Sequence, residues 1–147
     1  MRWRLPLRTR IFPETSGPMI YIVQNILPIF LAALLGLVIG AVWLKLSRRN
    51  LPSPGVLLVV FLCEFWLAAI LAGALILAPP RAGEWAMALG SAFIIWIGFI
   101  LPAFAATLRA VGVAWGRVGS VVAHWLVVML AQAALMQAIG LSGPPAG

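Results

Sequence analysis

Four long apolar runs dominate the pattern of hydrophobic and polar positions along the chain. They extend over about residues 21–46, 55–77, 85–108 and 118–141. Each reaches the length of about 20 residues that an α-helix needs to cross the hydrocarbon core of a bilayer. None alternates between apolar and polar residues, as the strands of a membrane β-barrel do. The pattern therefore predicts an all-α membrane protein, an antiparallel bundle of four transmembrane helices joined by short connections.

Composition agrees with lipid as the main solvent of the chain. Of the 147 residues, 64% are hydrophobic and only 9% are charged, whereas a soluble domain is charged at about a quarter of its positions. The only cysteine is Cys63, which excludes an intrachain disulfide and a CxxC motif. We expect the lipid bilayer to be the main partner, and we expect no cofactor, no metal site and no nucleic acid.

The net charge of +7 comes from basic residues at the ends of the apolar runs, where they anchor helices and set orientation. We call side B the membrane face reached by the connections LSRRNLPSP and RAVGVAWGR, and side A the face of both termini. Side B receives five cations, which are Lys45, Arg48, Arg49, Arg109 and Arg117. Side A receives Arg81 and the four arginines of residues 1–18.

Residues 1–18, MRWRLPLRTRIFPETSGP, differ from the remaining transmembrane domain, residues 19–147. We predict a basic tail lying on anionic headgroups. The alternative is that translation starts at Met19, which leaves one cation on side A against five on side B. We favour side B in the cytoplasm, with both termini outside it.

Glu64 is an isolated carboxylate in the apolar stretch FLCEFWLAAI. Placing a charged carboxylate in lipid costs about 2.5–3.5 kcal/mol or more, so the side chain should face the bundle and find a partner or become neutral. Counted along its helix, it lies roughly 13 Å from side B, and His124, the only histidine, lies roughly 9 Å from the same side. His124 is therefore the only ionisable candidate for a partner in the apolar part of the chain, and the sequence leaves open whether the two side chains touch.

Further polar residues are expected in the same layer. Arg117 and Ser120 share a helix face with His124, and Thr107 ends the third helix nearby. Pro102 cannot donate a hydrogen bond to the carbonyl of Gly98, which frees that carbonyl and favours a kink. These residues predict either a proton- or ligand-handling site open to side B, or a buried hydrogen-bonded pair that fixes helix register. A third alternative is that Glu64 faces a helix of a partner protein.

Small residues and other amides suggest how the helices contact one another. Gly36 and Gly40 form a small-xxx-small stripe that allows close approach of helix backbones, and Gly98 and Pro102 are expected to shape packing of the third helix. Gln132 and Gln137 could hydrogen-bond across helices.

With these residues in view, the chain resembles domain-of-unknown-function family 1761, small bacterial four-helix membrane proteins. The resemblance rests on IGAVW at 39–43, WIGFILPA at 96–103 and the AWGR that precedes the last helix, and it covers about residues 19–140. Where the family commonly has an aromatic residue, this chain has Leu44. The resemblance implies the four-helix fold and the bacterial inner membrane, and it implies no activity.

No catalytic set of residues is present in the sequence, so we expect a protein that is not an enzyme. The leading expectation is an accessory component that acts as a homo-oligomer or as a small subunit of a larger membrane complex. The alternative is a small proton-linked transporter or channel that uses Glu64 and His124. A polar cavity open to side B would favour transport, and a sealed contact between Glu64 and His124 would favour the subunit.

Overall fold

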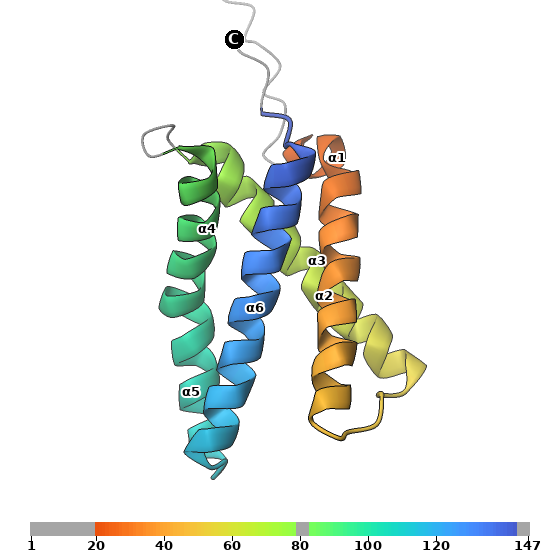
Figure 1. The fold of residues 1–147 in the computed structure, drawn as a ribbon, viewed down its shortest axis with the longest axis vertical. Helices are drawn as coiled ribbons and strands as arrows, with labels where there is room; N and C mark the ends of the chain where they lie inside the picture. Colours follow the sequence, from red (N-terminus) through yellow and green to blue (C-terminus); the bar gives the residue numbers. More distant parts are fainter. Residues whose placement is uncertain (1–19, 79–82, 144–147) are drawn as a thin grey trace, which may run out of the picture.

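The computed structural model describes residues 20–78 and 83–143, and this part of the chain is all-α (Figure 1). It contains four helices that are long and apolar enough to cross a membrane, Ile26–Leu46, Pro54–Leu77, Glu84–Ala110 and Trp115–Ile139. The predicted four-helix membrane fold is thereby confirmed. The predicted basic tail, residues 1–18, the alternative start at Met19 and Arg81 all lie outside the described residues.

The elements follow one another with short connections. In chain order they are α1 (Ile20–Gln24), α2 (Ile26–Leu46), α3 (Pro54–Leu77), α4 (Glu84–Ile95), the π-helical turn η1 (Trp96–Ile100), α5 (Leu101–Ala110) and α6 (Trp115–Ile139). The segments α4, η1 and α5 together make the third membrane-spanning helix.

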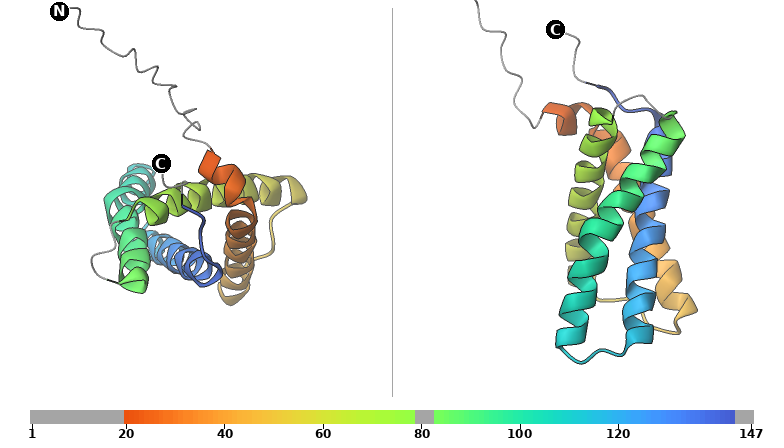
Figure 2. Two further views of the ribbon diagram at one scale, coloured as in Figure 1. Left: turned by 90° about the horizontal axis from the view of Figure 1, so that it is seen from above. Right: turned by 90° about the vertical axis from the view of Figure 1, so that its left-hand side faces the viewer.

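One helix crosses the other three. Figure 1 and the view from above in Figure 2 show the third helix, α6 and α2 as one layer, with α3 running diagonally behind it. The loop 47–53 and the turn 111–114 lie at the same end, the bottom of Figure 1, which is side B. At this end the ribbons of α2, α3 and α6 diverge (Figure 1).

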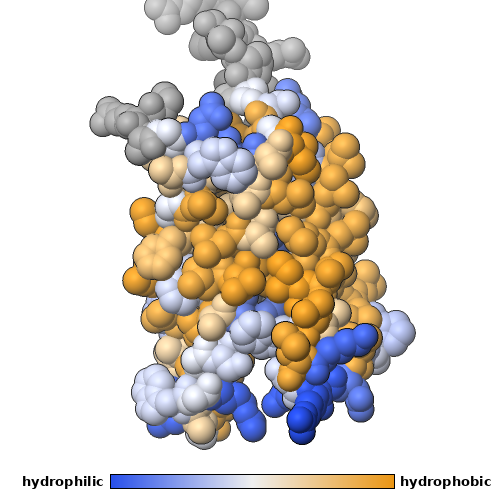
Figure 3. Space-filling model, viewed as in Figure 1, coloured by the Kyte–Doolittle hydropathy of each residue, from blue (hydrophilic) through white to orange (hydrophobic). Residues whose placement is uncertain are grey.

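Small side chains fill the centre of the bundle, which lets the helix backbones approach closely. The fully buried core consists of alanines packed with a few larger residues, namely Ala32, Ala68, Ala69, Ala72, Ala92 and Ala133 with Ile29, Leu71, Met129 and Met136. Most large apolar side chains point outward instead, and they form the apolar belt around the middle of the molecule in Figure 3. This distribution is the one that a lipid solvent favours.

Both connections on side B begin with the same helix-ending arrangement, the Schellman motif. After α2, the backbone N–H of Arg48 donates to Lys45 O at 3.0 Å and that of Arg49 donates to Leu44 O at 2.9 Å. The motif requires a left-handed residue, which is Arg48 here (φ +53°) and Gly112 after α5 (φ +83°). An arginine thus stands at a position where glycine is usual.

Two of the four predicted helices are interrupted: the break in the first was not expected, and the break in the third lies at the predicted kink near Pro102. The first predicted helix is divided at Asn25, which is 1% exposed and whose amide donates to the carbonyls of Tyr21 and Ser142 at 2.9 and 3.0 Å. In return the N–H of Ser142 donates to Asn25 Oδ1 at 2.7 Å, so this side chain holds the segment after α6 against the start of α2.

The second break is η1, where the N–H of Leu101 bonds to Trp96 O, five residues back. This wide turn accommodates the expected disturbance by Pro102, because a proline in a regular helix collides with the carbonyl four residues back. The indole N–H of Trp96 donates to Val122 O at 2.9 Å and ties the turn to α6.

Candidate functional site

Glu64 lies where α2, α3 and α6 meet. Its side chain is 2% exposed, and its Oε2 accepts a 2.7 Å hydrogen bond from Nε2 of Gln132 on α6. The same nitrogen donates to the carbonyl of Ala32 on α2 at 3.3 Å. The candidate partner His124 is therefore not the residue that Glu64 contacts, and the partner is Gln132, one of the two amides that could bond across helices.

Gly36 provides the space that the carboxylate occupies. A Cβ atom at this position would collide with the carboxylate, at 2.6 Å from Cδ of Glu64 and 3.0 Å from Nε2 of Gln132. Gly40, one turn further along α2, is less crowded, since a Cβ there would meet only Cε1 of His124, at 4.0 Å. The two glycines of the stripe therefore do different things: Gly36 allows a close contact, and Gly40 borders open space.

His124 lies in an aromatic environment, apart from the carboxylate. The centroid of its ring is 5.2 Å from that of Trp43 on α2 and 5.8 Å from that of Trp125. Its Nδ1 atom is buried and has no hydrogen-bond partner in the described part of the chain. The imidazole is thus held by contacts with aromatic rings, and its Nδ1 atom can still form a hydrogen bond with a bound molecule.

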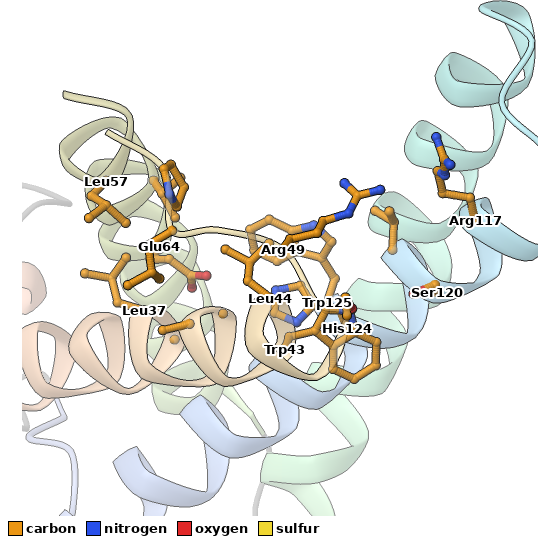
Figure 4. A pocket seen from close by; sticks show the side chains of 18 residues that line it. Leu37, Trp43, Leu44, Arg49, Leu57, Glu64, Arg117, Ser120, His124 and Trp125 are labelled. Atoms are coloured by element: carbon orange, nitrogen blue, oxygen red, sulfur yellow. The ribbon is translucent and has the colours of Figure 1, made fainter. Parts of the chain in front are cut away.

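A cavity of about 540 Å³ connects these residues. It lies between α2, the loop 47–53, α3 and the first half of α6, where these helices spread apart toward side B (Figure 4). Its polar lining comes from Glu64, His124, Ser120 and Arg117, which were predicted to lie together, and from Ser47 and Arg49. The volume falls in the range of about 300–1,000 Å³ typical of small-molecule sites.

The charged groups of the lining lie at opposite ends of the cavity. In Figure 4 the carboxylate of Glu64 points into the cavity at its inner end, while Arg49 reaches across toward α6 and Arg117 lies near the start of α6. Trp43, Leu44, Leu57 and Trp125 are among the apolar and aromatic residues that line the cavity. The arrangement is an apolar chamber with cations at the mouth and one carboxyl group at its inner end.

Three of the predicted residues lie away from this cavity. Thr107, Gly98 and Pro102 are all exposed, and a Cβ at Gly98 would meet no atom within 4 Å. The prediction that the third helix contributes to the polar layer and packs through Gly98 is wrong. The reason is its position in the layer: the third helix packs on the side of α6 away from α2.

Arg49 and Gln132 complete the site and were not assigned to it from the sequence. In the sequence Arg49 resembles an ordinary basic anchor after a helix, and its place in the cavity lining depends on the course of the loop after α2, where Arg48 is left-handed. Gln132 lies far along α6, and no pattern within its own helix indicates which neighbour it reaches. Within residues 20–78 and 83–143, no group of three or more His, Cys, Asp or Glu side chains is arranged to hold a metal ion.

No family model matches the chain, and comparison with curated proteins and with solved structures gives no match. The resemblance to domain-of-unknown-function family 1761 therefore stays a prediction.

Proposed function

We propose that the protein binds a small molecule in the cavity between α2, α3 and α6 and acts as a small proton-linked transporter or channel. The supporting observation is the cavity itself, which is open to side B and has Glu64 and His124 on one surface. Lipid packing does not account for a chamber of about 540 Å³ that ends at a carboxyl group. Glu64 is the group that would exchange protons, because no other carboxylate among the described residues lines the cavity.

The second candidate is the accessory role, as a homo-oligomer or as a small subunit of a larger membrane complex. The outer face of the third helix favours it, where Phe93, Ile94 and Phe99 are exposed by 45%, 67% and 71%. Both a partner helix and lipid chains can cover such a face, so it is weaker support than the cavity.

We infer that side B faces the cytoplasm of a bacterial inner membrane and that both termini lie outside the cytoplasm. The support is charge: Lys45, Arg48, Arg49, Arg109 and Arg117 all lie on side B, where cytoplasmic loops carry excess cations. In the part of the chain described, side A carries the acidic Glu84 at the start of α4.

Accessibility of the cavity to water-soluble reagents tests the proposed function. In a Cys63→Ser background, Gly40→Cys places a thiol on the cavity wall, about 9 Å from the end of α2. Val42→Cys is the matched control, because it lies closer to side B on the same helix but is 52% exposed on the outer surface and does not line the cavity.

We expect membrane-impermeant thiol reagents added on side B to label Gly40→Cys at least about tenfold faster than Val42→Cys, since a thiol in lipid remains protonated and inaccessible. Ser120→Cys gives a second thiol in the lining, on α6. If neither cavity thiol reacts faster than Val42→Cys, the chamber is closed to solutes and the accessory role takes its place.

A further inference from the structure

The cations of side B are not equivalent. Of the five, only Arg49 and Arg117 line the cavity. Arg109 is already engaged, since it donates to Val113 O at 2.7 Å and lies 4.8 Å from the ring centroid of Trp115. Two guanidinium groups are therefore available at the mouth of the chamber.

Neither of these guanidinium groups has an acidic partner in the described residues, which include two carboxylates. Glu64 is bound by Gln132 at the inner end, and Glu84 lies at the start of α4 on side A, within 3.2 Å of Nε2 of Gln137. A guanidinium group matches a carboxylate or a phosphate, to which it donates paired hydrogen bonds. The mouth is thus suited to an anion that comes from outside the chain.

The walls behind the mouth require an apolar occupant. Leu44, Leu57, Val60 and Trp125 are among the residues that line the cavity. A small hydrated anion would leave these surfaces in contact with water, whereas an apolar chain would bury them at a gain of about 25 cal/mol per Å². The carboxyl group of Glu64 disfavours an anionic group at the inner end, which keeps the head group of a ligand at the mouth.

We propose that the cavity takes an anionic amphiphile, a molecule with one carboxylate or phosphate head group held by Arg49 and Arg117 and an apolar tail that enters the chamber. This inference deepens the proposed function and rests on it. A cationic amphiphile is disfavoured, because its head group would have to pass two guanidinium groups to reach Glu64. The ligand could come from the bilayer or from solution, and the chemistry of recognition is the same in both cases.

Charge selection at the mouth is the first part of the test. The protein with Gly40→Cys and Cys63→Ser, in phosphatidylcholine nanodiscs, is reacted with an anionic and with a cationic methanethiosulfonate reagent, each rate being divided by that for free 2-mercaptoethanol. We expect the normalised labelling rate of the anionic reagent to exceed that of the cationic reagent by at least about tenfold. This factor is the lower end of the rate enhancement that charges of one sign at a cleft give to an oppositely charged solute. Arg49→Gln with Arg117→Gln should abolish the preference, and Lys45→Gln, which lies outside the lining, should keep it.

Protection by ligands is the second part. Decyl phosphate, inorganic phosphate and decyltrimethylammonium are each added before the thiol reagent. We expect decyl phosphate at about ten times its dissociation constant to slow labelling about tenfold, and we expect the double arginine variant to lose this protection. Ser120→Cys repeats the measurement from α6, in case Gly40→Cys disturbs the fold.

The outcomes separate the two proposals. If the cavity thiols do not react at all, the proposed function fails and the ligand class fails with it. If they react but decyltrimethylammonium protects as well as decyl phosphate, the proposal of an accessible cavity holds. The proposal that the ligand has an anionic head group is then wrong. If inorganic phosphate protects as well as decyl phosphate, the ligand is a free anion and the apolar tail is wrong.

Discussion

The side-chain amide of Gln132 donates a 2.7 Å hydrogen bond to the carboxylate of Glu64 and so joins α6 to α3 at the inner end of the cavity. Both side chains are almost completely buried, at 0% and 2% exposure. The contact separates the chamber on side B from the alanine-rich core.

Removing the amide should leave the carboxyl group without its donor. We expect Gln132→Met to lower the free energy of unfolding by about 1–3 kcal/mol, the cost of a buried polar group that has lost its partner. Methionine has nearly the same shape, so the effect reports the hydrogen bond more than the packing. Adding Glu64→Met should recover most of the loss, because two apolar side chains need no partner. The measurement is unfolding in detergent by heat or by sodium dodecyl sulfate, and a double variant no more stable than Gln132→Met would contradict the assignment.

Changing the carboxyl group to an amide should separate structure from function. In Glu64→Gln the new side-chain oxygen can still accept the hydrogen bond from Gln132, so we expect the folded bundle to form and unfolding to change little. Proton exchange should be lost, because an amide carries no titratable proton. Proton flux into liposomes that contain a pH-sensitive dye and hold a potassium diffusion potential checks this. Equal flux in Glu64→Gln and in the wild-type protein would remove Glu64 from the proton pathway.

Two glycines on one face of α2 should respond differently to the same added methyl group. Gly36→Ala places a Cβ against the Glu64 carboxylate, and we expect a loss of about 1–3 kcal/mol in stability, as for other overpacked sites. Gly40→Ala adds its methyl group to the open wall of the cavity, and alanine is favoured over glycine in a helix by up to about 1 kcal/mol. Stability should therefore stay the same or rise. Equal destabilisation of both variants in thermal unfolding would argue against the crowded contact at Gly36.

The left-handed residue after α2 offers a test of the loop. Arg48 has φ +53°, a conformation that costs a residue with a Cβ atom about 1–2 kcal/mol. We expect Arg48→Gly to raise stability by up to about 1 kcal/mol and Arg48→Val to lower it, since a β-branched residue tolerates this conformation least. Arg48→Ala is the control, because it removes the charge and keeps the Cβ atom. If Arg48→Ala is stabilised as much as Arg48→Gly, charge and not backbone conformation is responsible.

The sequence predicts the four helices because their number follows from the lengths of apolar runs, and lipid requires each run to satisfy its own backbone. Their ends differ only slightly from the prediction, for example at Trp115, where α6 begins ahead of the expected Val118. The division at Asn25 is harder to predict, because it depends on hydrogen bonds to Ser142, which lies at the other end of the chain.

The partner of Glu64 could not be predicted, for a geometric reason. The distance of a residue from side B, counted along its own helix, can be compared between helices only when they begin at the same level and run parallel. Helix α3 is tilted and begins at a different level from α6 (Figure 1). Residues at similar counted depth, such as Glu64 and His124, therefore do not meet, while Gln132 reaches the carboxylate from further along α6. Helix tilt and rotation come from packing between helices, which the pattern within one helix does not contain.

The contact between Gly36 and Glu64 also constrains the order in which mutations can accumulate. A side chain at position 36 packs without crowding only after position 64 has lost its long carboxylate, so a change at position 36 that comes first produces a less stable intermediate. The two positions should therefore change together as related chains diverge, although they are far apart in sequence. In descendants of this protein, replacement of Gly36 should therefore be found mainly together with replacement of Glu64.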